Sequence, residues 1–370
     1  MPPAHITSDT APEIDGRSFA AAQAFILTAK LYWTREIFPA LKRDYEARAA
    51  AAENPPETAT DAADLIGGTT LYQVYAWLER HLQRFKYSGR YGLQPYHAQQ
   101  RVALEASLDP ADLPPGLLDL DPGFNQPAYY TAVDIHQHPG GVWSDEIAGF
   151  VYERGARTTT PLLGRNHKDL HGRFTQLVDE TGPRPRRLLD MGCGFGKSTQ
   201  PFCESFEEAE VVGIDLSGPC LKLAARDAAR ADNERGARNV TFRQMDAART
   251  DFEDGSFDLV TSTMLLHEMP PPALEVLFEE AHRVLAPGGR MVHLDFYHLP
   301  DAFARFIHCG HGRRNNEPYM QPLADMDVKA TLEDKGFRNV EIRPFEEADG
   351  VLDASYGKWR FPWTVIMAER

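Results

Sequence analysis

The chain has 370 residues, of which 42% are hydrophobic and 25% charged, and it carries a formal net charge of −15. This length and composition fit a globular protein with one large or two smaller domains. A surface this acidic repels phosphate backbones, so the charge argues against nucleic acid as a partner. The four cysteines lack the spacing of a disulfide or metal frame, and no stretch is apolar for long enough to span a membrane. The sequence therefore predicts a cytoplasmic protein.

The chain begins with a polar segment, residues 1–17, which is expected to form a mobile tail. From Ser18, apolar side chains recur every three or four residues as far as Ile37, which predicts a helix that Pro39 kinks or ends. After an expected loop at residues 50–69, a second amphipathic helix follows. Its apolar stripe consists of Leu71, Val74, Tyr75, Leu78, Leu82 and Phe85. Both stripes favour packing in the core of a small helical bundle, with a partner-binding surface as the alternative.

Histidines gather in the segment Tyr129–Gly141, which follows a stretch rich in proline, aspartate and glycine at residues 109–128 that is expected to be irregular. If the histidine segment is extended, Asp134, His136 and His138 share one face. Such a face could hold zinc or another divalent ion. Because histidine spacing by itself is a weak signal, we predict no metal site.

A change of pattern places a domain boundary near residue 183. A helix from about His167 to Glu180 precedes the boundary, and afterwards predicted strands alternate with predicted helices. This alternation indicates a parallel sheet covered on both faces. The last two strands have only the irregular stretch 345–361 between them, which suits an antiparallel hairpin at one edge. The predicted strands are Arg187–Met191, Val211–Leu216, Val240–Met245, Phe257–Thr263, Arg290–Phe296, Asn339–Pro344 and Pro362–Ala368.

A glycine turn follows the first of these strands, in the run Asp190-Met191-Gly192-Cys193-Gly194-Phe195-Gly196. Glycine is needed where the backbone takes a positive φ or where a ligand lies against it. The run is not a phosphate-binding P-loop, because position 191 is Met, and its spacing differs from the G-x-G-x-x-G of dinucleotide-binding proteins. An acid two residues before G-x-G-x-G resembles motif I of the class I S-adenosylmethionine (SAM) methyltransferases.

This resemblance covers roughly residues 186–370 and implies a Rossmann-like α/β fold, with a seven-stranded, mostly parallel sheet and a reversed final hairpin. It also implies a SAM site, with S-adenosylhomocysteine as the product. In the family's order, the glycine turn approaches the methionine part of SAM and an acid attracts its ammonium group. Later acids bind the ribose hydroxyls and the adenine amino group. The residues of this sequence that match the family's cofactor-binding positions are Asp190, Gly192, Cys193, Gly194, Asp215, Leu216, Asp246, Ala247, Thr263 and Met264.

Methylation of an oxygen or an activated carbon benefits from a general base, and histidine suits that role near neutral pH. His267 follows the fourth predicted strand at the binding edge of the sheet and is the first candidate. His267 could instead only hydrogen-bond its own loop or the cofactor. His136 and His138 are the second candidates, because the amino-terminal half must cover the open edge if the site is to exclude water. The segment between Phe296 and Gln321 is expected to be a loop that contributes to the acceptor pocket.

We therefore expect a helical, partly irregular cap at residues 18–182, which binds the acceptor, and a SAM-dependent methyltransferase domain at residues 183–370. The expected reaction moves a methyl group from SAM to a small, apolar or aromatic acceptor at oxygen or carbon. Methylation of a small metabolite at nitrogen or sulfur is the first alternative, and a non-catalytic SAM-binding scaffold is the second. The G-x-G-x-G spacing disfavours NAD-dependent oxidoreduction. A homodimer is left open.

Overall fold

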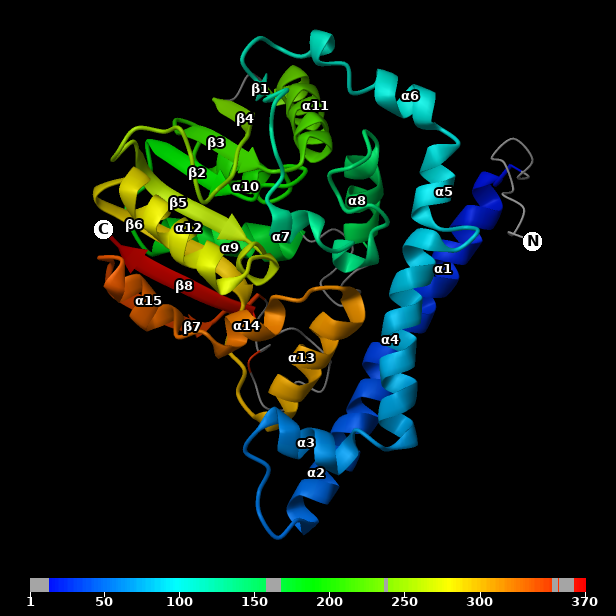
Figure 1. Ribbon diagram of the computed structural model, residues 1–370. Helices are drawn as coiled ribbons and strands as arrows, with labels where there is room; N and C mark the ends of the chain where they lie inside the picture. The colour runs from blue at the N-terminus through cyan, green and yellow to red at the C-terminus, as the bar shows by residue number, and fades with distance from the viewer. Residues whose placement is uncertain (1–12, 158–167, 236–238, 348–351, 353–362) are drawn as a thin grey trace.

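The chain from residue 187 onward forms the predicted alternation of strands and helices around one mixed sheet (Figure 1). The computed structural model describes residues 13–157, 168–235, 239–347, 352 and 363–370. The sheet has eight strands in the order β1-β4-β3-β2-β5-β6-β8-β7. The strands are β1 (Leu118–Asp119), β2 (Arg187–Met191), β3 (Glu210–Asp215), β4 (Val240–Gln244), β5 (Phe257–Thr263), β6 (Leu285–Phe296), β7 (Arg338–Pro344) and β8 (Trp363–Glu369).

The reversed final hairpin is confirmed, because β8 lies between β6 and β7 and is antiparallel to both. The pairs from β1 through β6 are parallel. The strand count differs from the expected seven, since the two residues of β1 pair with β4 in a stretch expected to be irregular. Two residues are too few to give a strand pattern, so this pairing comes from tertiary contact. The fold is the mostly parallel α/β sheet that the sequence predicts.

Neighbouring residues on the central strands enter two different hydrophobic cores, as the alternation of side chains along a strand requires. Leu188 and Val211 belong to the first core, and Leu189 and Val212 belong to the second. The second core lies under α12 (Pro271–Val284). The first core is larger, because it also receives buried side chains from the amino-terminal helices. The layer on this face of the sheet therefore includes both halves of the chain.

The helices that accompany the strands are well formed, and one of them replaces an expected loop. Residues between Phe296 and Gln321 form α13, which begins after the N-cap Asp301 and buries Phe303 and Phe306. Burial against α3 and α4 stabilises this helix, and a sequence segment read by itself does not show such a contact. The other helices are α9 (Lys168–Glu180), α10 (Thr199–Ser205), α11 (Gly218–Arg235), α14 (Met320–Asp325) and α15 (Val328–Asp334).

The amino-terminal half is helical, as expected, but two local features need comment. Pro39 does not end the helical run, because the π-helical turn that precedes it (Trp33–Ile37) joins the first helix to the next. Proline lacks an N–H and its ring crowds the preceding turn, so this π-helical turn is a local distortion of the kind expected at Pro39. The expected loop 50–69 contains α3, which begins with a capping box at Thr58. The helices are α1 (Gly16–Tyr32), α2 (Phe38–Ala51), α3 (Ala59–Ile66), α4 (Thr70–Ser88), α5 (Leu93–Ala98), α6 (Arg101–Ala106), α7 (Ala128–Thr131) and α8 (Ala148–Ala156).

The apolar stripe of α4 is only partly in the core. Tyr75 and Leu82 are buried, whereas Val74 and Phe85 are 42% and 48% exposed, so core packing is the wrong prediction for the last two. Figure 1 shows α4 beside α1 at the side of the molecule away from the sheet. Of the expected tail, residues 1–12 lie outside the described residues, and so does most of the irregular stretch 345–361. Within the described ranges, every helix is too short or too polar to cross a membrane.

Candidate active site

A cavity of about 440 Å³ opens at the carboxyl ends of the central parallel strands. Its floor consists of the turns after β2, β3, β4 and β5, where such sheets bind their ligands. Its other walls come from the expected cap, through α7, α8 and the turn at His136, and from Glu317 after α13. Residues far apart in the sequence therefore share one enclosed space.

The glycine turn after β2 takes the backbone angles that its sequence predicts. Gly192 and Gly194 have φ values of 67° and 52°, and both line the cavity. A Cβ at Gly192 would lie 2.8 Å from the Leu265 side chain, whereas a Cβ at Gly194 would meet no atom within 4 Å. The turn thus leaves open space above Gly194, where a ligand can lie against the backbone.

Two predicted cofactor residues lie behind the turn and do not line the cavity. Asp190 is fully buried, and one of its oxygens accepts hydrogen bonds from Ser198 at 2.8 Å and Thr199 at 2.7 Å. Burial raises the pKa of Asp190 to about 6, against the effect of these two hydroxyls. The Cys193 side chain packs in the first hydrophobic core. In this structure both side chains support the turn, and direct contact with a ligand would fall to the neighbouring glycines.

The acid at the end of β3 holds the glycine turn from the opposite side. The Asp215 carboxylate accepts hydrogen bonds from the Gly194 and Ser217 N–H groups, each at 2.8 Å. Burial raises the pKa of Asp215 to about 6, although these hydrogen bonds act to lower it. Asp215 and the next residue, Leu216, both line the cavity. Each carboxylate oxygen can accept a second hydrogen bond, so Asp215 can still bind a pair of hydroxyl groups.

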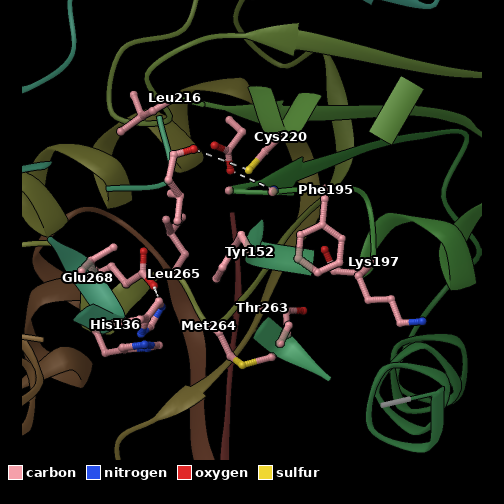
Figure 2. A pocket seen from close by; sticks show the side chains of 18 of the residues that line it. His136, Tyr152, Phe195, Lys197, Leu216, Cys220, Thr263, Met264, Leu265 and Glu268 are labelled. Atoms are coloured by element: carbon pink, nitrogen blue, oxygen red, sulfur yellow. Dashed lines mark hydrogen bonds and ion pairs between the residues drawn. The ribbon is translucent and has the colours of Figure 1, made fainter. Parts of the chain in front are cut away.

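The remaining predicted cofactor residues also line the cavity. Asp246 and Ala247 follow β4, and the Asp246 carboxylate accepts from the Ala248 N–H at 2.9 Å. Thr263 ends β5, and Met264 follows it with φ at 60°. A positive φ is uncommon for a residue with a side chain, and it turns the chain sharply at the cavity. Figure 2 shows Thr263 and Met264 side by side in the close view of the pocket.

His267 lines the cavity and forms a buried dyad with Asp295. His267 Nδ1 lies 2.6 Å from Asp295 Oδ1, and the side chains are 2% and 0% exposed. Asp295 also accepts hydrogen bonds from the Leu266 and Phe296 N–H groups, which fix its orientation. Burial acts to lower the pKa of His267, but the Asp295 carboxylate outweighs burial and raises it. With Nδ1 oriented toward a carboxylate, Nε2 is the nitrogen left to accept a proton.

His136 also reaches the cavity, but both of its ring nitrogens face carboxylates. Nε2 lies 2.9 Å from Glu268, and Nδ1 lies 3.0 Å from Glu317. Burial acts to lower the pKa of His136, and the two carboxylates raise it to about 10. Figure 2 shows Glu268 beside His136 at one side of the cavity. At neutral pH His136 is therefore a cation that holds two acids together, which does not suit a proton acceptor.

This ion pair continues into a buried chain of charges. His311 lies 3.6 Å from Glu317 and 2.6 Å from Glu79, and Arg314 pairs with Glu79. Burial opposes charge on His311, but the two carboxylates raise its pKa to about 9. The pKa of Glu317 falls well below its ordinary value, because His311 and His136 outweigh the effect of burial. The chain joins α4 and α13 to the wall of the cavity.

The histidine segment is not extended, so the expected shared face is wrong. His136 and Gln137 have φ values of 55° and 57°, which turn the chain. His136 therefore enters the cavity, while His138 is buried outside the cavity lining, 5.1 Å from the Tyr87 ring between centroids. Burial lowers the pKa of His138 to about 4. The Asp134 carboxylate instead accepts from the Gly140 N–H. Among the side chains that the structure describes, no group of three or more His, Cys, Asp and Glu could hold a metal ion.

Aromatic side chains line the cavity, and no pattern in the sequence marks them as site residues. Tyr129 and Tyr130 come from α7, and Tyr152 comes from α8. Tyr152 stacks on His136, with centroids 5.8 Å apart, and meets the Phe195 ring edge-to-face at 5.5 Å. Figure 2 shows Tyr152 and Phe195 close together in the pocket. Only their position in the folded chain distinguishes these residues from other aromatics.

Comparisons with known proteins agree with the motifs. Residues 188–289 match the family model described as a methyltransferase domain. The chain is 38% identical over 165 residues to the chloroplastic tocopherol O-methyltransferase of Arabidopsis thaliana. The aligned residues make up 42% of this chain and 45% of that protein. The chain is also 38% identical over 112 residues to the demethylmenaquinone methyltransferase of Thermus thermophilus. This alignment covers 30% of this chain and 48% of that protein.

The chain spans about half the length of these curated relatives. Among solved structures, it is similar to phosphoethanolamine N-methyltransferase 2 of Haemonchus contortus in complex with SAM, with a TM-score of 0.45 and 19% identity. That match covers 66% of this chain and 60% of the other. The family match and the ordered motifs together identify a class I SAM-dependent methyltransferase domain in this chain.

Proposed function

We propose that the protein transfers a methyl group from SAM to a small, apolar or aromatic acceptor at oxygen or carbon. One observation carries the proposal: a single cavity is lined by eight of the ten motif residues, by aromatic side chains and by His267 of the His267–Asp295 dyad. In this reading Asp215, Leu216 and Asp246 hold the nucleoside part of SAM. The aromatic wall from the expected cap then covers the acceptor.

The protein does not have to activate the methyl group, since the sulfonium of bound SAM supplies it in electrophilic form. The chain must align the acceptor with that methyl group and exclude water. Tyr129, Tyr130 and Tyr152 line the cavity, and aromatic rings pack well on an apolar or aromatic molecule. His267 can take the proton that a hydroxyl or an acidic carbon releases, because Asp295 orients it and raises its pKa.

The proposal is tested by incubating the purified protein with methyl-labelled SAM and a panel of acceptors. The panel contains phenols, quinols and acidic carbon compounds, together with amines and thiols of similar size. Label in a phenol, quinol or carbon product supports the proposal. Label only in amines or thiols would favour the first alternative. SAM binding without transfer to any compound of the panel or of a metabolite extract would favour the scaffold.

Replacing Asp215 is expected to weaken SAM binding. In Asp215→Ala the acceptor for the ribose hydroxyls is lost, and so is the hydrogen bond that holds the Gly194 N–H. We expect a loss of about 1–3 kcal/mol in binding free energy, measured by calorimetry. Asp254→Ala is the control, because Asp254 is exposed and pairs only with Arg283 among its described partners. Unchanged SAM affinity in Asp215→Ala, or tighter binding of NAD than of SAM, would contradict the cofactor assignment.

The cap and the location of the protein belong to the same proposal. Residues 18–182 supply Tyr129, His136 and Tyr152 to the cavity wall, which supports a role in acceptor binding and water exclusion. We propose the cytoplasm as the location, which the scattered spacing of the cysteines supports.

A further inference from the structure

Large apolar side chains are exposed on the outer face of the α1–α4 helix pair. The exposed fractions are 70% for Phe25, 58% for Tyr32, 42% for Val74, 56% for Trp77 and 48% for Phe85. Single exposed apolar residues are normal on protein surfaces, but five large ones on two adjacent helices are not. We call these five side chains, together with Arg80 and Arg84, the α1–α4 outer surface.

The spacing of the residues places them on one side of each helix. Phe25 and Tyr32 are seven residues apart, or two turns, and the buried positions of α1 are Phe19, Gln23, Ile26 and Lys30. On α4, Val74, Trp77 and Phe85 likewise repeat at helical spacing, away from the buried stripe that contains Tyr75, Glu79 and Leu82. The two helices contact each other at the edge of the molecule (Figure 1), and each presents an exposed apolar side.

The charge of this surface is opposite to that of the protein. The chain carries a net charge of −15, yet Glu79 is the only acidic residue in α1 and α4, and it is buried against Arg314. Arg80 and Arg84 are exposed between the aromatic side chains. Within α1 and α4, both fully described, the outer side therefore presents cations and aromatic rings without an exposed carboxylate. The exposed Glu36 follows Tyr32 by four residues, in the adjoining π-helical turn.

We propose that the α1–α4 outer surface binds the surface of a membrane that contains anionic lipids. Trp and Tyr rings favour the depth of the lipid headgroups, and Phe and Val can enter the acyl boundary. Arginines beside them are attracted to anionic headgroups. A second copy of this chain fits less well. Two such surfaces face to face would bring Arg80 and Arg84 of both copies together, with no carboxylate from either helix to pair with them.

The proposal is tested by flotation of the full-length protein with phosphatidylcholine vesicles that contain or lack phosphatidylglycerol. We expect binding to the anionic vesicles, weakened by salt. The double variant Trp77→Glu/Phe85→Glu should weaken this binding by about tenfold or more, as should Arg80→Glu/Arg84→Glu. Val102→Glu is the matched control, because Val102 is 83% exposed on α6, outside the surface, and its variant should bind like the wild type.

Three results would overturn the proposal. The first is that the wild type does not float with anionic vesicles. The second is that the Trp77→Glu/Phe85→Glu variant floats as well as the wild type. The third is that light scattering shows a dimer of the wild type which this double variant converts to a monomer, because a second copy then covers the surface. Circular dichroism of each variant distinguishes lost binding from lost folding, with Arg80→Glu/Arg84→Glu as the milder change, since both arginines are exposed. The test needs neither SAM nor an acceptor, so its outcome is separate from that of the proposed function.

Discussion

His267→Ala is expected to lower kcat by a factor of about 10²–10⁴ while leaving SAM affinity unchanged, if the acceptor reacts at oxygen or carbon. The physical reason is that, under the proposed function, Nε2 of His267 accepts the proton released by the acceptor, while Nδ1 lies 2.6 Å from Asp295 Oδ1. Turnover is measured at saturating SAM, and SAM affinity is measured separately by calorimetry. A fall in rate that follows a fall in SAM affinity would make His267 a cofactor ligand instead.

The pH dependence gives this assignment a second readout. Because Asp295 raises the pKa of His267 above its ordinary value of 6.5, the wild-type rate should rise with pH through a step above 6.5. Asp295→Asn removes the charge that opposes burial, so the step should move to lower pH while kcat falls. A purely structural role for Asp295 would change the rate without moving the step.

The other two candidate histidines serve as comparisons. His136 is paired with Glu268 and Glu317, and His138 lies outside the cavity lining, so neither is suited to accept the proton. His138→Ala should therefore keep the native pH profile of kcat. His136→Ala is expected to lower stability, because it removes the partner of Glu268 and Glu317, but its pH profile of kcat should also keep the His267 step. Near-native turnover in all three alanine variants would contradict histidine catalysis and make a nitrogen or sulfur acceptor the better account.

That Asp215, Asp246 and Thr263 lie at one edge of the sheet was predictable from the sequence because of how parallel sheets are built. Asp215, Asp246 and Thr263 each stand at the end of a predicted strand, and parallel strands bring their carboxyl ends to one edge. The order of the motifs therefore fixes their neighbourhood without knowledge of side-chain contacts. Asp190 also stands at a strand end, but its side chain is buried behind the turn, hydrogen-bonded to Ser198 and Thr199, and does not line the cavity.

The side-chain contacts that join the amino-terminal half to the cavity wall were not predictable, since they link distant segments. Glu79 and His311 are 232 residues apart in the sequence, and His136 and Glu317 are 181 apart. No periodicity links residues over such distances. The turn at His136 depends on a positive φ in a residue that seldom adopts one, and for this reason an extended segment was the wrong expectation.

The largest expected effect on stability is that of Glu317→Gln. Glu317 is 5% exposed and lies between His136 and His311, both of which are charged at neutral pH. Breaking a buried ion pair by removing one partner leaves an uncompensated charge, which typically costs about 3–5 kcal/mol in the free energy of unfolding. Urea unfolding measures the change. Glu333→Gln is the control, because Glu333 and its partner Lys329 are both more than half exposed. Its free energy of unfolding should change by no more than about 0.5 kcal/mol.

The same cluster predicts how the free energy of unfolding depends on pH. The pKa values of His136 and His311 are about 10 and about 9 in the folded protein, above the ordinary 6.5. Their contribution to stability is therefore fully present below pH 6.5 and is lost as the pH rises toward 9 and 10. In Glu317→Gln both histidines lose a carboxylate partner and their pKa values fall toward 6.5. The variant should thus be less stable at neutral pH, and it should lose less stability between pH 6.5 and 10 than the wild type. Equal alkaline slopes in the two proteins would show that the His136–Glu317–His311 cluster does not carry this charge coupling.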